Sequence, residues 1–146
     1  MPILVVMLLF NPSIDLMSVQ NTLVADTSIL SLMNLSSATN LEKFKRITRE
    51  SKWSDLASNE RRLCIYFLQS RPIPNRSFRE EVLQIDCHVP AGSGFFAYQV
   101  MENVVKLLHE KKINKRYFEL YGQLGELPTA SGFFCCGSRF TFNRKI

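Results

Sequence analysis

Apolar residues recur at helical spacing in two parts of the chain. Between residues 13 and 33 they repeat every three or four positions, and Asp26-Thr27-Ser28 offers a second helix start inside this segment. We therefore expect one kinked helix or two short ones, with Ser13 as the first N-cap. Another amphipathic helix follows the turn at 90–94, with Ser93 as its cap. Its expected core stripe is Ala97, Met101, Val104, Val105 and Leu108.

The pattern of residues 41–50 fits both a helix and extended structure. Leu41, Phe44 and Ile47 are spaced as in a helix, but extended structure is an open alternative for this basic segment. Trp53 follows in a loop, where we expect the large ring to pin the chain to the core.

Alternating patterns predict four strands. Residues 62–69 are apolar on both faces, which is typical of a strand in the middle of a covered sheet. Two prolines then mark a turn at 71–76, and residues 78–89 resume the alternation. These two strands predict a hairpin with a long, protruding, basic loop. Residues 116–121 and 133–143 supply the other strands, and a Gly-rich connection at 122–132 joins them.

The order of these elements predicts an α+β fold: a mostly antiparallel four-stranded sheet with two to three helices packed on one face. A chain of 146 residues is the size of one domain, which we expect at 13–146. Residues 1–12 form an apolar N-terminal extension. It is far shorter than a membrane span and lacks the basic start and small-residue cleavage site of a signal peptide.

Composition indicates a folded protein with a weak basic excess. Apolar residues make up 46% of the chain and charged residues 21%, which excludes a disordered protein. The net charge is +5, and all 18 basic residues follow Asn40. Such an excess suits nearby nucleic acid, an acidic neighbour or an ordinary solvated face. A nucleic-acid-binding module that uses the basic segment 43–49 is therefore our alternative function.

The chain carries no recognisable catalytic or metal motif. Phosphate-binding glycine patterns are absent, and the four cysteines lack the spacings of a zinc knuckle or a disulfide scaffold. Adjacent Cys135 and Cys136 should point to opposite faces of a strand, which makes a metal site shared with Cys87 and His88 awkward. A thiol enzyme at Cys87-His88 would need a local signature that we do not find. We expect free thiols, no metal, no cofactor and no enzymatic activity.

The strand at 78–89 has one apolar and one polar face. Leu83, Ile85, Cys87 and Val89 alternate with Gln84, Asp86 and His88, so we expect His88 to be partly exposed or at an interface. In the last strand, period-2 alternation places Phe134, Cys136, Phe140 and Phe142 on one core face.

Several segments together resemble the tail terminator, or tail completion, proteins of long-tailed bacteriophages. The segments that carry the resemblance are 83–90 (LQIDCHVP), 106–109 (KLLH), 116–118 (RYF), 127–133 (LPTASGF) and 139–142 (RFTF), with weaker similarity at 45–47 and 63–67. The similarity also favours extended structure within 41–50. It does not reach residues 1–11.

The resemblance implies a structural virion protein. It implies a hexameric ring in the phage neck that terminates the tail tube and joins it to the head-side connector, or stopper, protein, with assembly in the host cytoplasm. Genomic DNA would pass through the channel without sequence-specific binding, and no cofactor or membrane would be needed. A ring closes through heterologous contacts, which need exposed loops. The contacts that we expect are Arg71, Pro72, Pro74, Asn75 and Arg76 in one loop, and Gln123, Glu126, Leu127, Pro128 and Thr129 in the other.

Overall fold

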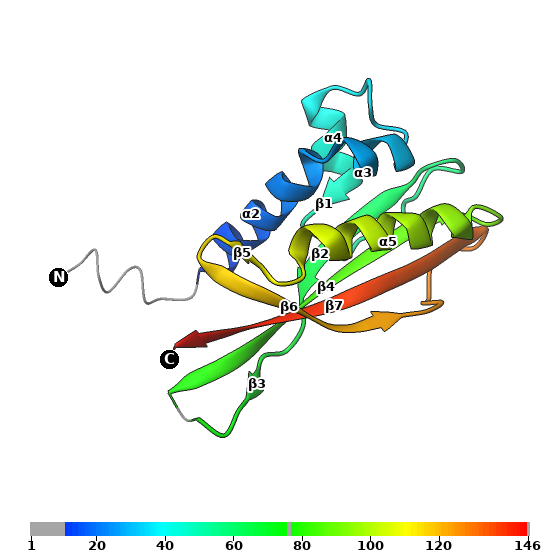
Figure 1. The fold of residues 1–146 in the computed structure, drawn as a ribbon. Coiled ribbons are helices and arrows are strands. Elements are labelled where there is room, and N and C mark those ends of the chain that lie inside the picture. Colours follow the sequence, from blue (N-terminus) through cyan, green and yellow to red (C-terminus); the bar gives the residue numbers. More distant parts are fainter. Residues whose placement is uncertain (1–10, 76, 146) are drawn as a thin grey trace.

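A computed structural model describes residues 11–75 and 77–145 of the chain (Figure 1). Most of the predicted extension, residues 1–10, and the predicted contact Arg76 lie outside the described residues. Pro12 belongs to the first described helix rather than to an extension. Among the residues that the structure describes, no helix is long and apolar enough to span a membrane.

The sheet has seven strands, so the predicted four-stranded sheet is wrong. The strand order is β1-β2-β4-β7-β6-β5, with β3 paired to β4, and β1 and β2 are parallel while the other pairs are antiparallel. The strands are β1 (Ile47–Thr48), β2 (Arg62–Phe67), β3 (Arg71–Pro72), β4 (Phe78–Pro90), β5 (Lys111–Ile113), β6 (Arg116–Leu124) and β7 (Phe133–Lys145). The four predicted strands are present. The sequence analysis missed β1, β3 and β5 because two or three residues are too short for a pattern.

The helices α2 (Pro12–Val24), α3 (Thr27–Leu32) and α5 (Gly94–Leu108) lie over one face of the sheet, and α4 (Asn40–Arg46) lies near the β1 edge (Figure 1). Of the two alternatives predicted for 13–33, one kinked helix or two short ones, the structure shows two separate helices, of 13 and 6 residues. The Asp26 carboxylate caps α3 by accepting a hydrogen bond from the Ile29 amide at 2.9 Å. Asn11, not Ser13, is the N-cap of α2, and Ser93 occupies the N-cap of α5 without a side-chain hydrogen bond.

The ambiguous segment 41–50 contains both structures in succession. Thr39 caps α4, whose helix ends at Arg46, and Ile47 immediately begins β1 beside Leu63 of β2. Gln20 of α2 donates a hydrogen bond to the Ile47 carbonyl oxygen at 2.6 Å. The chain therefore changes from helix to strand at the point where the backbone finds β2 as a partner.

The core lies between the helices and the sheet face that carries the alternating apolar residues of β4 and β7. These strands pair without interruption from Phe78↔Lys145 to Pro90↔Phe133. The predicted shared face of β7 is confirmed, because Cys136, Phe140 and Phe142 are buried in this core and Phe134 packs against it. Four of the five residues predicted for the α5 stripe are buried, and Val105 is half-buried at its edge.

The opposite face, here called the second face, is covered at one end by loops instead of helices. Trp53 stacks on the His88 ring with the centroids 5.9 Å apart, so it packs its loop onto the second face and not, as predicted, onto the core. A second loop is held to the sheet by the Leu127 amide, which donates a hydrogen bond to the Cys135 carbonyl oxygen at 2.8 Å. These covering loops leave His88 only 1% exposed, so the predicted partial exposure of His88 is wrong.

The sheet is strongly curled. Arg71 of β3 donates a hydrogen bond to the Tyr121 hydroxyl of β6 at 2.8 Å, although β4 and β7 lie between these strands in the sheet order. The prolines do not exclude pairing, because Pro72 lies in β3 opposite Arg79. We call β3, the loop residues 73–75 and 77, and the first residues of β4 the arm; these residues lead away from the helices (Figure 1).

Candidate functional site

Polar side chains from three neighbouring strands meet on the second face. Their Cα register sets Cys64 of β2 beside Asp86 of β4, and His88 of β4 beside Cys135 of β7. Asp86 and His88 are 6% and 1% exposed, and Cys64 and Cys135 are fully buried. Burial of so many polar groups is costly unless they are partnered. We call Asp86, His88 and Cys135 the second-face cluster.

His88 is held by both ring nitrogens. Nδ1 lies 2.7 Å from the Thr129 hydroxyl, and Nε2 lies 3.7 Å from the Cys135 sulfur. Burial lowers the pKa of His88 to about 4, with a further contribution from the positive charge of Arg62. The imidazole is therefore neutral at neutral pH, and one nitrogen keeps a lone pair.

Asp86 accepts hydrogen bonds from two neighbours. The Tyr66 hydroxyl donates to one carboxylate oxygen, and Gln84 donates to the other at 2.8 Å. Arg139 in turn donates to the Gln84 amide oxygen at 2.9 Å. Burial raises the pKa of Asp86, while the hydrogen bonds from Tyr66 and Gln84 act in the opposite direction.

A glycine makes room for this carboxylate. Gly137 of β7 lies opposite Asp86 in the sheet. A Cβ atom on Gly137 would clash with Asp86 Oδ1 and would lie 2.8 Å from the Ile85 carbonyl oxygen. The absent side chain is thus part of how the cluster is built.

The four cysteines divide between the two faces, as predicted for Cys135 and Cys136. Cys87 and Cys136 lie in the core under the helices, whereas Cys64 and Cys135 lie on the second face. Burial raises the pKa of all four thiols, that of Cys64 to about 11 and that of Cys136 to about 12. Cys87 faces away from His88, so the geometry gives no support to a thiol enzyme built on that pair.

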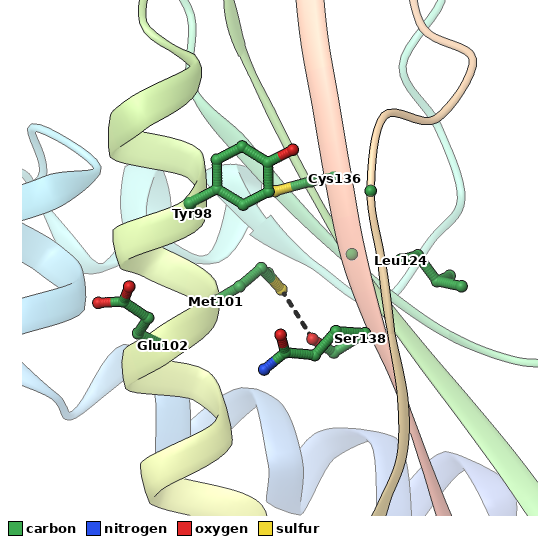
Figure 2. A pocket seen from close by; sticks show the side chains of 9 residues that line it. Tyr98, Met101, Glu102, Leu124, Cys136 and Ser138 are labelled. Atoms are coloured by element: carbon green, nitrogen blue, oxygen red, sulfur yellow. Dashed lines mark hydrogen bonds between the residues drawn. The ribbon is translucent and has the colours of Figure 1, made fainter.

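A groove lies between α5 and the neighbouring strands, on the helix side of the sheet. Figure 2 shows Tyr98 and Met101 directed from α5 toward Cys136 and Ser138 of β7, with Glu102 turned outward. The volume of the groove is about 310 Å³. Within it, the Ser138 hydroxyl donates to the Met101 sulfur at 3.5 Å. Gln123, a predicted contact residue, lines this groove together with the end of β6.

Exposed aromatic side chains gather beside the groove at the start of α5. Phe95, Phe96 and Tyr98 are 71%, 40% and 46% exposed. Arg61 stacks over the Phe96 ring at 4.7 Å, and Tyr98 packs on Phe134 with centroids 5.5 Å apart. Large apolar groups clustered in this way on a surface mark an interaction site more often than isolated ones do. Sequence analysis missed them because α5 was read only for its core stripe.

The predicted contacts of the first loop lie on the arm. Pro72, Pro74 and Asn75 are exposed there. Arg71 is half-buried, pairs with Glu80 and lies 4.4 Å above the Tyr121 ring, so its charge is used within the chain.

The predicted contacts of the second loop do not form one exposed surface. Gln123, Glu126 and Pro128 are exposed. Leu127 and Thr129 instead turn toward the second face, where Leu127 approaches Gly137 and Thr129 bonds His88. The connection is therefore partly a cover for the second-face cluster.

The basic segment 43–49 is partly neutralised by acidic neighbours. Arg46 pairs with Glu42 at 2.9 Å and lies 4.0 Å from buried Glu60. Lys45 and Arg49 are exposed. Ion pairing therefore engages Arg46, whereas Lys45 and Arg49 remain on the surface.

No family model and no curated protein matches this chain.

The sequence analysis did not predict the second-face cluster, because the residues of this cluster come from strands that are distant along the chain. His88 and Cys135 are 47 positions apart and meet only through the β4–β7 register. Reading the polar face of each strand as solvent-facing concealed the contact. The one available signal was that this face carries Asp86 and His88 two positions apart.

Proposed function

We propose that the chain is a non-enzymatic assembly subunit that closes into a ring through head-to-tail contacts, and that this ring sits at the head-tail junction of a long-tailed bacteriophage. The observation that carries the assembly role is the exposed aromatic surface of Phe95, Phe96 and Tyr98 beside a groove of about 310 Å³. The phage setting rests on the sequence resemblance.

Head-to-tail contact needs two different surfaces on one subunit, placed so that each meets the other on a neighbour. The two surfaces lie at opposite ends of β4: the arm includes the first residues of this strand, and the aromatic surface follows its last residue (Figure 1). A strand of 13 residues separates these ends by about 40 Å. We propose that the arm of one subunit contacts the aromatic surface and groove of the next.

Native mass spectrometry and light scattering test the ring. We expect one closed species, a hexamer by the resemblance, at subunit concentrations of about 0.1 mM, where even contacts weaker than micromolar would be populated. A chain that stays monomeric at this concentration, both alone and with tail tube or connector protein added, would contradict the proposal.

The variant Phe95→Ser/Tyr98→Ser tests the surface. It should weaken subunit association by at least about tenfold, because aromatic residues at the centre of an interface carry much of its energy. Leu41→Ser is the matched control, since Leu41 is 70% exposed on α4, which packs near β1 and lies apart from both the arm and the start of α5. Equal association of both variants would exclude the aromatic surface as the contact.

Electron microscopy of virions tests the location. Phage that lack this protein should yield unjoined heads and tails or overlong tails. Normal joined particles would contradict the junction role while leaving the ring measurement valid.

A further inference from the structure

We propose that the second-face cluster is a binding site for a divalent transition metal of the zinc class, with Nε2 of His88, the sulfur of Cys135 and the carboxylate of Asp86 as ligands. The ligand atoms of these three side chains lie within 4.8 Å of one another, and all three residues are buried. The inference goes beyond the proposed assembly role and does not depend on it.

The geometry fits a tetrahedral ion. Zinc bonds of about 2.3 Å to sulfur and about 2.0 Å to nitrogen, at a tetrahedral angle, place the two ligand atoms about 3.5 Å apart. The observed separation of Cys135 Sγ and His88 Nε2 is 3.7 Å. The space that Gly137 leaves lets the Asp86 carboxylate approach the same point. A water molecule can complete the fourth position.

Two of the three ligands, His88 and Asp86, also have outer partners that would hold them in a binding orientation. Thr129 engages His88 Nδ1 at 2.7 Å, which directs the other ring nitrogen toward Cys135. Tyr66 and Gln84 hold the Asp86 carboxylate, and the Arg139-to-Gln84 hydrogen bond extends this support. Neutral histidine with such a second hydrogen bond is the usual form of a protein metal ligand.

The charges balance in the buried site. A thiolate, a carboxylate and a neutral imidazole carry two negative charges together, which match a divalent cation. On binding, the Cys135 S–H bond breaks, the sulfur forms a bond to the metal, and the proton leaves to solvent. The nitrogen, sulfur and oxygen donor set selects the borderline-soft zinc class over calcium or magnesium, which prefer oxygen ligands alone.

The site has a structural consequence for the molecule. It would tie β4 to β7, and through Thr129 it would fasten the connection at 125–132 to the sheet. Metal binding would therefore stabilise the folded chain and hold the exposed Glu126 and Pro128 in place.

Cobalt provides the spectroscopic test. Because the cluster is buried, the full chain is refolded from urea with Co²⁺, or with Zn²⁺ in a parallel sample. We expect one ion per chain by elemental analysis, a thiolate-to-cobalt charge-transfer band and visible bands of tetrahedral intensity. The fluorescence of Trp53, the single tryptophan, should fall with bound Co²⁺ because its ring stacks on His88. A refolded wild-type chain that binds less than about a tenth of an equivalent overturns the proposal, since structural zinc sites load to completion.

Cys135→Ser should abolish the charge-transfer band and weaken Co²⁺ binding more than about 100-fold, beyond the effect of losing an outer partner. Cys136→Ser is the matched control, because this adjacent sulfur lies on the core face and should leave the band unchanged. Circular dichroism verifies that each variant is folded. A band that survives in Cys135→Ser overturns the assignment.

Thr129→Val keeps the three ligands and removes only the hydrogen bond to His88. We expect cobalt affinity about 10–100-fold lower with the charge-transfer band retained. This variant keeps a test available even where Cys135→Ser does not fold, and an unchanged affinity would exclude Thr129 as the residue that orients His88 for the metal.

Discussion

Among the six glycines, Gly137 has the most restrictive environment. Any side chain there meets the Asp86 carboxylate and the Ile85 backbone, and a backbone atom in a central strand cannot move aside cheaply. Gly137→Ala should therefore lower the free energy of unfolding by about 1–3 kcal/mol, as overpacking does in cores. Urea unfolding measures the change.

Gly122→Ala is the control for this substitution. A Cβ atom at Gly122 has nothing within 4 Å. Its free energy of unfolding should stay within about 0.5 kcal/mol of wild type. Equal losses in the two variants would mean that backbone freedom, and not the Asp86 contact, explains Gly137.

His88 should make the chain sensitive to acid. Its pKa is about 4 in the folded chain against an ordinary 6.5, so the unfolded chain binds a proton in this interval that the folded chain does not. Stability contributed by His88 is therefore complete above pH 6.5 and is lost as pH falls toward 4. Asp86, whose pKa is raised, acts in the opposite direction.

The comparison of wild type with His88→Gln isolates this effect, because Asp86 is retained in both. With chelator present, urea midpoints measured from pH 7 to pH 4 should fall more steeply in wild type. Parallel slopes for the two proteins would show that His88 is not buried in its neutral form.

At the scale of elements, the arm should serve assembly more than folding. Its loop at 73–77 has mostly exposed side chains among the residues described there. Replacing 73–77 by Gly-Asn-Gly should change the free energy of unfolding by less than about 0.5 kcal/mol and abolish the ring seen by native mass spectrometry.

The turn between β5 and β6 supplies a matched control for the arm. Lys115 adopts a φ of 64°, which glycine tolerates without cost, so Lys115→Gly should leave both stability and assembly unchanged. Retention of the ring after the arm is shortened would contradict the proposed contact.

The long strands and the α5 stripe were predictable at this scale because their periodicity extends over several residues. The helix-to-strand change at Arg46 and Ile47 was not, since the same residues satisfy either pattern until β2 offers Ile47 a partner. The short strands β1, β3 and β5 likewise depend on neighbours for their definition.

At the scale of the whole molecule, the proposed ring predicts weak contact with DNA. The net charge is +5, and Arg46 is partly neutralised by Glu42. We expect duplex binding to be detectable only at low salt, with a shallow dependence on salt concentration because few phosphates are contacted. Fluorescence anisotropy at several salt concentrations measures this.

The variant Lys43→Gln/Lys45→Gln separates the two functions. If the proposed ring function is correct, this variant should assemble like wild type. Steep salt dependence that this variant abolishes would instead favour the nucleic-acid-binding alternative that uses segment 43–49.

What the sequence determined by itself was local: the amphipathic face of α5, the long alternating strands and the separation of Cys135 from Cys136 across a strand. These follow from the fixed periods of helix and strand, which need no partner. Only the tertiary structure decided which strands pair, that loops bury the polar face of β4, and that His88 meets Cys135 and Asp86. Alternation in a single strand shows which residues share a face, but the partner strand and the loop that covers the face depend on contacts with residues distant along the chain.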